Sequence, residues 1–222
     1  MYAVTSSPTV APLCSESIYL GNCSGFAIHG GSDVTFDGVT TVVHYGSVGT
    51  YPGTSITGAY RLEHGFPYSA TVLASQCATA RQVAYTGLMA MTCTQSITDG
   101  VISGMTLTTG VYCSDTGTFS TVGYGVLTLD GQNSTAGGIW VFQAVSTVIT
   151  GGYSSVLLRN KALTKNVYWS VGSSATIGLS SSFLGTILAY ASITFGHDSV
   201  FIGRALAGAA VTFESGSSLT LP

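Results

Sequence analysis

The last third of the chain carries a repeating pattern of apolar and polar positions. Three segments of about eighteen residues each hold a strand-like apolar run followed by a short apolar–Thr–apolar triplet. The triplets are Ala175-Thr-Ile177, Ile193-Thr-Phe195 and Val211-Thr-Phe213. Because neighbouring side chains of a strand point to opposite faces, the apolar pair of each triplet points inwards and its Thr points outwards. Strand-like pieces that recur at so short a period predict the stacked coils of a β-solenoid.

Stacking these coils places the outward threonines in one column, with about 4.7–4.9 Å between neighbouring strands. Nine residues separate Gly138 from Thr147, as they separate Gly185 from Thr194, so Thr147 is expected in the same column. Near the N-terminus, Val34 and Phe36 flank Thr35 in the same way. The predicted outward surface comprises Thr35, Ser120, Thr147, Ser174, Thr176, Ser192, Thr194, Ala210 and Thr212. Since Thr suits exposed strand positions in general, such a ladder is also typical of a purely structural solenoid.

Residues 69–92 depart from the strand pattern and predict one long α-helix. Apolar residues recur there at steps of three and four, at Leu73, Cys77, Ala80, Ala84, Leu88 and Met91. Ser69, which follows Pro67, is the N-cap candidate. A single apolar stripe needs a partner surface, so we expect the helix to pack along one side of the solenoid. Residues 105–219 are expected to form the C-terminal coils, and residues 1–222 a single domain.

The composition narrows the class of partner. Charged residues make up 7% of the 222-residue chain, where a soluble protein has about 25%, and Gly contributes 29 residues. A net charge of −3 with scattered cations gives no reason to expect nucleic acid or an anionic membrane as partner. No apolar run reaches the eighteen residues of a transmembrane helix. Residues 1–12 lack the basic and apolar segments of a secretory signal.

Five cysteines without a CxxC spacing argue against a zinc site or a redox dithiol. Two disulfides and one remaining thiol in an extracellular protein form one hypothesis, and buried free thiols form the other. Cys14 with Cys23, and Cys77 with either Cys93 or Cys113, are candidate pairs. Cysteine spacing alone does not determine the pairing.

Catalytic patterns are missing from the sequence. It contains no nucleophile elbow, zinc-binding HExxH, phosphate-binding loop or dinucleotide fingerprint, and its four histidines are isolated. The nine acidic residues are too few to place paired carboxylates on one coil. We therefore predict no enzymatic activity, no cofactor and no metal. Arg204 is interpreted as a structural donor to loop carbonyls rather than a ligand clamp, and His197-Asp198 as a solvated turn.

Several separated segments resemble one known family, in that family's order. They include Lys165–Val171, Phe183–Leu188, Gly203–Ala207, Met105–Tyr112 and Ile139–Gln143. The chain resembles the ice-binding (antifreeze) proteins of cold-adapted bacteria, snow moulds, yeasts and sea-ice diatoms. The resemblance implies a mainly β fold, a right-handed discontinuous β-solenoid of triangular cross-section with one long helix along its side. It also implies that the N-terminal coils and the coils after the helix share one stack.

The same resemblance implies a function. One flat face would adsorb to ice, causing thermal hysteresis and inhibiting ice recrystallisation, in a secreted and monomeric protein. The family often carries Thr-Ala/Gly-x-Thr/Asn on that face. Here Ser173–Thr176, Ala191–Thr194 and Ala209–Thr212 keep the last Thr and replace the first. The alternative function is an extracellular adhesive or structural module that binds glycans or matrix through edge strands and aromatic residues.

Overall fold

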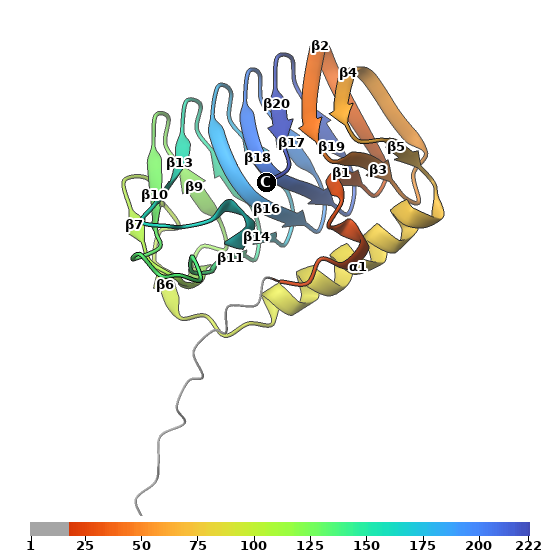
Figure 1. The fold of residues 1–222 in the computed structure, drawn as a ribbon. Coiled ribbons are helices and arrows are strands. Elements are labelled where there is room, and N and C mark those ends of the chain that lie inside the picture. The colour runs from red at the N-terminus through yellow and green to blue at the C-terminus, as the bar shows by residue number, and fades with distance from the viewer. Residues whose placement is uncertain (1–17) are drawn as a thin grey trace, which may run out of the picture.

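A computed structural model describes residues 18–222, so Cys14 and the other residues before Ile18 lie outside the described part. The described chain is a stack of coils with one helix along its side (Figure 1). All of its strands belong to one sheet, and the pairings between them are parallel. Each coil inside the stack contributes a strand to each of three faces, because short turns break the coil at three corners.

The first face, called the helix face, is the one on which the helix packs. It consists of β1 (Phe26–Gly30), β3 (Ser47–Thr50), β5 (Pro67–Ser69), β6 (Gln95–Ile97), β8 (Gly110–Ser114), β11 (Trp140–Ala144), β14 (Val167–Val171) and the second halves of β16 (Ser182–Ala189) and β18 (Val200–Ala207).

The second face, called the threonine face, holds the apolar–Thr–apolar triplets. It consists of β9 (Phe119–Thr121), β12 (Val148–Thr150), β15 (Ala175–Ile177), β17 (Ile193–Phe195), β19 (Val211–Phe213) and the first parts of β2 (Asp33–Tyr45) and β4 (Ser55–His64).

The third face closes the coil. It consists of β7 (Thr106–Leu107), β10 (Val126–Asp130), β13 (Ser155–Arg159), β20 (Ser218–Thr220), the first halves of β16 and β18, and the second parts of β2 and β4.

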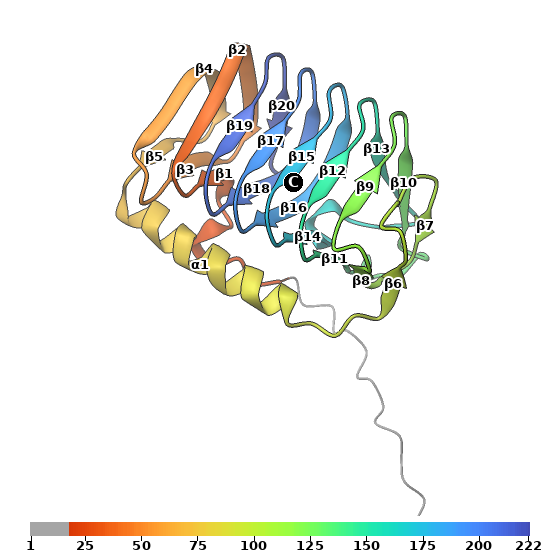
Figure 2. The ribbon, with the colours of Figure 1, turned by 180° about the vertical axis from the view of Figure 1, so that it is seen from behind.

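The order of the coils in space differs from their order in the chain. β1 lies between β18 and β3, and β2 lies between β19 and β4. The N-terminal coils therefore stack on the last coils, and the C-terminus lies within the stack rather than at its end (Figure 1). This arrangement confirms the discontinuous β-solenoid that the resemblance implies. The helix carries the chain from one end of the stack to the other (Figure 2).

Aromatic side chains fill the interior from coil to coil. Phe142 and Trp169 stack with ring centroids 4.0 Å apart, and Phe195 and Phe213 stack at 4.4 Å. All four side chains are fully buried. Such stacking adds about 0.5–1.5 kcal/mol per pair beyond the burial of area. A close-packed interior of this kind resists deformation, and it gives the outer faces a rigid base.

The helix α1 spans Val72–Met89, inside the predicted range of 69–92. Its N-cap is Thr71, whose side chain accepts a hydrogen bond from the backbone N–H of Ala74 at 3.2 Å. The prediction of Ser69 as N-cap was wrong because Ser69 is the last residue of β5. The buried stripe consists of Ala74, Cys77, Arg81, Ala84 and Leu88. Three residues of the predicted apolar stripe, Cys77, Ala84 and Leu88, belong to it, whereas the predicted Leu73 is exposed.

Side chains of the helix face hold the helix in place. Nε2 of Gln143 donates to the carbonyl oxygens of Leu88 and Met91, at 2.6 and 2.8 Å, in the last turn of the helix and just after it. Nε2 of the buried His29 donates to the carbonyl oxygen of Ala74 at 3.0 Å. These contacts lie near opposite ends of the helix, so both ends are anchored to the same sheet.

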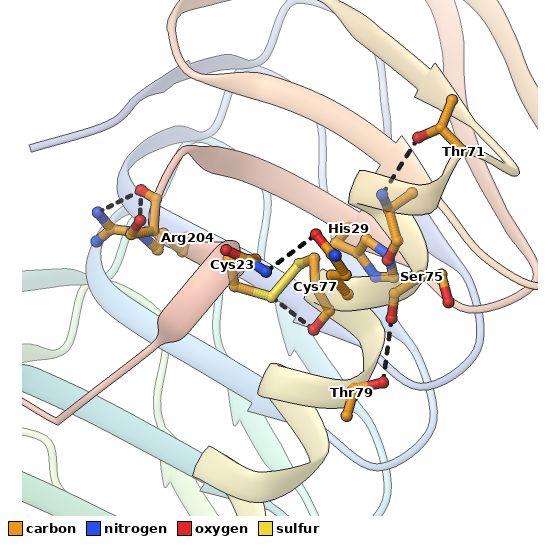
Figure 3. The surroundings of a disulfide bond; sticks show 11 residues. Cys23, His29, Thr71, Ser75, Cys77, Thr79 and Arg204 are labelled. Atoms are coloured by element: carbon orange, nitrogen blue, oxygen red, sulfur yellow. Dashed lines mark hydrogen bonds between the residues drawn. A yellow bond between two sulfur atoms is a disulfide. The ribbon is translucent and has the colours of Figure 1, made fainter.

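Two disulfides also join the helix region to the solenoid. Cys23, in the short helix η1 (Gly21–Cys23), bonds to Cys77 of α1 (Figure 3), and Cys93 bonds to Cys113 of β8. The prediction of two disulfides is confirmed. The candidate pairs were wrong, because Cys23 and Cys77 bond to each other. Cys77 faces the sheet on the buried stripe of the helix, where η1 lies against it.

Neither a membrane span nor a metal cluster is found in residues 18–222. No helix there is long and apolar enough to cross a membrane. The same residues contain no group of three or more His, Cys, Asp or Glu side chains that could hold a metal ion.

Candidate functional site

Five threonines form a continuous column on the threonine face. Thr176 pairs in register with Thr194, Thr194 with Thr212, Thr212 with Thr35, and Thr35 with Thr57. At the usual spacing of parallel strands, the column is about 19 Å long. The inward neighbours of these threonines are apolar, with Ile193, Phe195 and Val211 fully buried. The threonines themselves are exposed or half-buried, so each presents a methyl group and a hydroxyl group to solvent.

The prediction that Thr147 belongs to this column was wrong, and Ile149 holds that place. Ile149 pairs with Thr176 on one side and with Ser120 on the other. The error arose from the choice of Gly138 as the counterpart of Gly185. The true counterpart of Gly185 in this coil is Trp140. Trp140 pairs with Val167, and the pairing of β14 with β16 places Val167 beside Gly185. Gly138 lies two residues earlier, before β11 begins.

A second column runs beside the first, two residues earlier in each strand. It contains Thr118, Thr147, Ser174, Ser192, Ala210, Asp33 and Ser55. The predicted residues Ser174, Ser192 and Ala210 therefore do lie next to the threonines, and Thr147 joins them here. The hydroxyl oxygens of Thr118 and Thr147 are 3.0 Å apart.

The serines of the second column help to fix the stacking of the coils. The Oγ of Ser174 accepts a hydrogen bond from the backbone N–H of Ser192, and the Oγ of Ser192 accepts one from that of Ala210, both at 3.3 Å. Each serine binds the next coil in this way, which keeps neighbouring strands in register and the face regular. Each hydroxyl proton remains available to solvent, because a hydroxyl both donates and accepts.

Charge is nearly absent from the two columns. Asp33 is the one ionisable residue in them among the residues that the structure describes. Its carboxylate accepts hydrogen bonds from the hydroxyls of Ser32 and Thr35, at 2.6 and 3.3 Å. Both carboxylate oxygens of Asp33 thus accept hydrogen bonds from neighbouring hydroxyls, so they bind fewer solvent water molecules.

Thr57 was missing from the predicted site although the sequence carried a signal for it. Ser55-Ile-Thr57 repeats the small–apolar–Thr order of Ser192-Ile-Thr194, and Thr57 pairs with Thr35. The residue that follows Thr57 is Gly58 rather than an apolar residue, so the triplet was incomplete as a pattern. Thr57 extends the column to the last strand of this face.

The third face has a different surface. Leu157, Val200 and Ile202 each expose more than a third of their side chains, and they differ in shape from coil to coil. At the end of this face Glu63 accepts hydrogen bonds from Arg61 and His44 at 2.6 and 2.7 Å. Bulky apolar groups and an ion-pair cluster replace the mostly small, uncharged groups of the threonine face. The third face is therefore a natural control surface.

Arg204 and the His197-Asp198 turn have the structural roles predicted for them. Nε and Nη2 of Arg204 donate to the carbonyl oxygen of Ser24 at 3.3 and 3.0 Å, which confirms its interpretation as a donor to a loop carbonyl. His197 and Asp198 are exposed in a corner turn, where Nε2 of His197 lies 3.4 Å from the Glu214 carboxylate.

Comparisons with known proteins agree with this architecture. The family model described as Ice-binding-like matches residues 28–218. An ice-binding protein of Nostoc sp. (strain HG1) is 35% identical over 192 residues, covering 86% of this chain and 68% of that protein. The crystal structure of an ice-binding protein from the Antarctic ascomycete Antarctomyces psychrotrophicus superimposes with a TM-score of 0.85 at 32% identity, over 92% of this chain and 98% of that one.

A second solved structure is similarly close. The crystal structure of an ice-binding protein from an Antarctic biological consortium gives a TM-score of 0.84 at 35% identity, over 96% of both chains. Fold and sequence together define a discontinuous β-solenoid with one nearly uncharged face of threonines in register. The chain belongs to the ice-binding protein family. The proteins that it matches are named for ice binding and not for an enzymatic reaction.

Proposed function

We propose that this protein adsorbs to ice through the threonine face. The observation that carries the proposal is the in-register column of Thr176, Thr194, Thr212, Thr35 and Thr57. Ice is a regular lattice, so a protein surface that contacts it over many points at once has to repeat regularly itself. The threonine face repeats with the coil, and it lies on a side of the solenoid that the helix leaves free (Figure 2).

Each group on this face has a part in holding water. The Thr methyl groups favour ordered water around them, and the hydroxyls anchor that water by hydrogen bonds. Individual contacts of this kind are weak. Because the packed interior already holds the face rigid, forming many contacts together costs little additional conformational entropy. The scarcity of charge matters as well, since strongly hydrated ions impose their own water geometry.

Adsorbed molecules would block the growth of ice between them. Growth fronts then have to curve, which lowers the freezing point below the melting point and slows recrystallisation. The surface predicted from the sequence, with Ile149 and Thr57 added, is the adsorbing surface in this proposal.

The test places one bulky side chain on each of two faces of the same coil. Thr194→Tyr puts a ring in the threonine column, and Ser182→Tyr puts one on the exposed third face. We expect Thr194→Tyr to weaken the affinity for ice about tenfold, the effect of losing about 1.4 kcal/mol of adsorption energy, and thermal hysteresis should fall as a result. Ser182→Tyr should match the wild type, and circular dichroism should be unchanged in both. Full activity of a folded Thr194→Tyr variant would refute the assignment of this face.

We further propose that the protein acts as a secreted monomer, with residues 1–222 forming one ice-binding domain. The two disulfides support the extracellular assignment, because such bonds persist in oxidising compartments. A monomer leaves the threonine face free. Light scattering should give the 22.7 kDa of one chain, and a stable dimer mass would contradict this.

A further inference from the structure

A pair of neighbouring hollows lies near the N-terminal end of the described chain, away from the threonine face. The first has a volume of about 290 Å³ and is lined by Ile18, Tyr19, Leu20, Gly21, Ser24, Lys165, Tyr168 and Arg204. The second has a volume of about 310 Å³ and is lined by Tyr19, Gly21, Asn22, Gln76, Thr79 and Ala80. Tyr19 and Gly21 line both hollows, so the two are adjacent. Each is close to the lower limit for small-molecule sites.

The first hollow concentrates positive charge. Two of the six cationic residues of the chain, Lys165 and Arg204, line it. Within residues 18–222 neither of them forms a salt bridge. Arg204 uses Nε and Nη2 to hold the carbonyl oxygen of Ser24, and the guanidinium has further N–H groups beyond these. An anionic group in this hollow would therefore meet two cations that carry no carboxylate partner.

The floor of the first hollow is fixed. Tyr168 and Arg204 lie in one outward column of the helix face, because β14 pairs with β16 and β16 with β18 in register. Arg204 holds Ser24 at one end of the segment that covers this column, and the disulfide of the adjacent Cys23 joins that segment to α1 (Figure 3). The position of the guanidinium is thus set by the fold before any ligand arrives.

The second hollow offers uncharged hydrogen-bonding groups. Nδ2 of Asn22 donates to Oε1 of Gln76 at 3.0 Å, which orients both amides. Among the described residues, the remaining amide groups, Oδ1 of Asn22 and Nε2 of Gln76, have no hydrogen-bond partner. One accepts and the other donates, as recognition of sugar hydroxyls requires. Thr79 also lines this hollow, and its hydroxyl donates to the carbonyl oxygen of Ser75 at 3.2 Å.

Between the two hollows stands an aromatic ring. Tyr19 is 87% exposed, so its ring is accessible to a ligand that lies across the two hollows. An exposed ring can stack against the apolar face of a sugar. A cationic hollow, an amide-lined hollow and a shared aromatic ring together form a site with two subsites.

We propose that these hollows bind an acidic oligosaccharide, with the carboxylate of a uronic acid between Lys165 and Arg204. A neighbouring neutral sugar would lie in the amide-lined hollow, and Tyr19 would stack where the two sugars join. The site lies on a different face from the threonine column, so one molecule could hold ice and an acidic polysaccharide together.

The test uses the full chain and saturation-transfer NMR titrations. The probe is a tetrasaccharide that alternates glucuronate with N-acetylglucosamine. The comparison probes are the neutral N-acetylglucosamine tetramer and a sulfated tetrasaccharide without carboxylates. We expect the glucuronate probe to bind more tightly than both, and its affinity to fall as salt rises, because the contact is ionic. Equal binding of the neutral probe, tighter binding of the sulfated probe, or no binding of the glucuronate probe would overturn the proposal.

Matched variants locate the site. Lys165 and Tyr19 are both exposed, so replacing them should leave the fold intact. Lys165→Gln should weaken binding of the glucuronate probe about fivefold, the effect of losing one exposed charge contact. Tyr19→Ala should weaken it about tenfold through the lost ring contact. The controls Lys161→Gln and Tyr153→Ala, which alter exposed residues outside both hollows, should bind as the wild type does.

The two functions can be separated in the same experiment. Lys165→Gln should retain full thermal hysteresis, and Thr194→Tyr should retain full affinity for the glucuronate probe. A loss of glycan binding in Thr194→Tyr, or an equal loss in Lys161→Gln and Lys165→Gln, would overturn the placement of the glycan site in these hollows.

Discussion

Ile149 interrupts the hydroxyl column, and replacing it with Thr should strengthen ice binding. Ile149 lies in register between Thr176 and Ser120, and it is 47% exposed. The wild-type column of five threonines is about 19 Å long. Ile149→Thr adds a hydroxyl at its end and connects it to Ser120, so seven hydroxyl-bearing residues would be continuous over about 29 Å.

The expected gain follows from this length. The continuous column becomes about half again as long, so we expect thermal hysteresis at equal concentration to rise by about half. The substitution removes the equivalent of roughly one buried methylene from a half-exposed position, which should lower the free energy of unfolding by about 0.8 kcal/mol. Nanolitre osmometry measures the first effect, and urea unfolding measures the second.

A control separates the gain from a general effect of adding Thr. Leu157 is 40% exposed on the third face, and Leu157→Thr should lower the free energy of unfolding by a similar amount. It should leave thermal hysteresis unchanged. If Ile149→Thr gives no more activity than Leu157→Thr, the column does not act as one contact surface and the reasoning fails.

Three further predictions concern the scaffold. Burial lowers the pKa of His29 to about 4, so the unfolded chain binds more protons than the folded chain between pH 6.5 and 4. About 3 kcal/mol of stability, fully present above pH 6.5, should therefore be lost as the pH falls through this window. In urea titrations at several pH values, His29→Gln should remove most of this pH dependence. Replacing both Cys23 and Cys77 with Ser should lower the free energy of unfolding by about 4 kcal/mol, because their bond closes a loop of 54 residues; a thermal midpoint equal to that of the wild type would contradict this. Gln143→Met removes the donor to two helix-end carbonyls and should cost about 1–3 kcal/mol, whereas unchanged urea unfolding would show that water replaces the amide.

The sequence was informative wherever coils follow one another without insertions. Ile187 pairs with Ala205, eighteen positions later, so counting by eighteen correctly aligned Thr176, Thr194 and Thr212. Earlier coils are longer. Phe142 pairs with Trp169, twenty-seven positions later, because residues 160–166 form an extra loop with η2 (Thr164–Asn166). A local pattern does not reveal that Trp140, and not Gly138, is the counterpart of Gly185, and the error at Thr147 followed from that.

Long-range packing decided what periodicity left open. The spacing of apolar residues by three and four positions correctly predicted the helix, and Cys77, Ala84 and Leu88 are buried as expected. Arg81 is buried too, because its Nη1 donates to the carbonyl oxygen of Ala189, a contact 108 positions away in the chain. The disulfide partners depend on the same docking of α1 against η1. Such contacts arise from the arrangement of coils in space, which no single stretch of sequence encodes.

The most direct test of the central claim is the incorporation of protein into a slowly growing single crystal of ice. Thr212 lies in the middle of the threonine column, and Val200 lies on the third face of the same coil. We predict that Val200→Tyr enters the ice as the wild type does, and that Thr212→Tyr stays in the liquid. If Thr212→Tyr entered the ice at the wild-type level, the threonine face would not be the surface that binds ice.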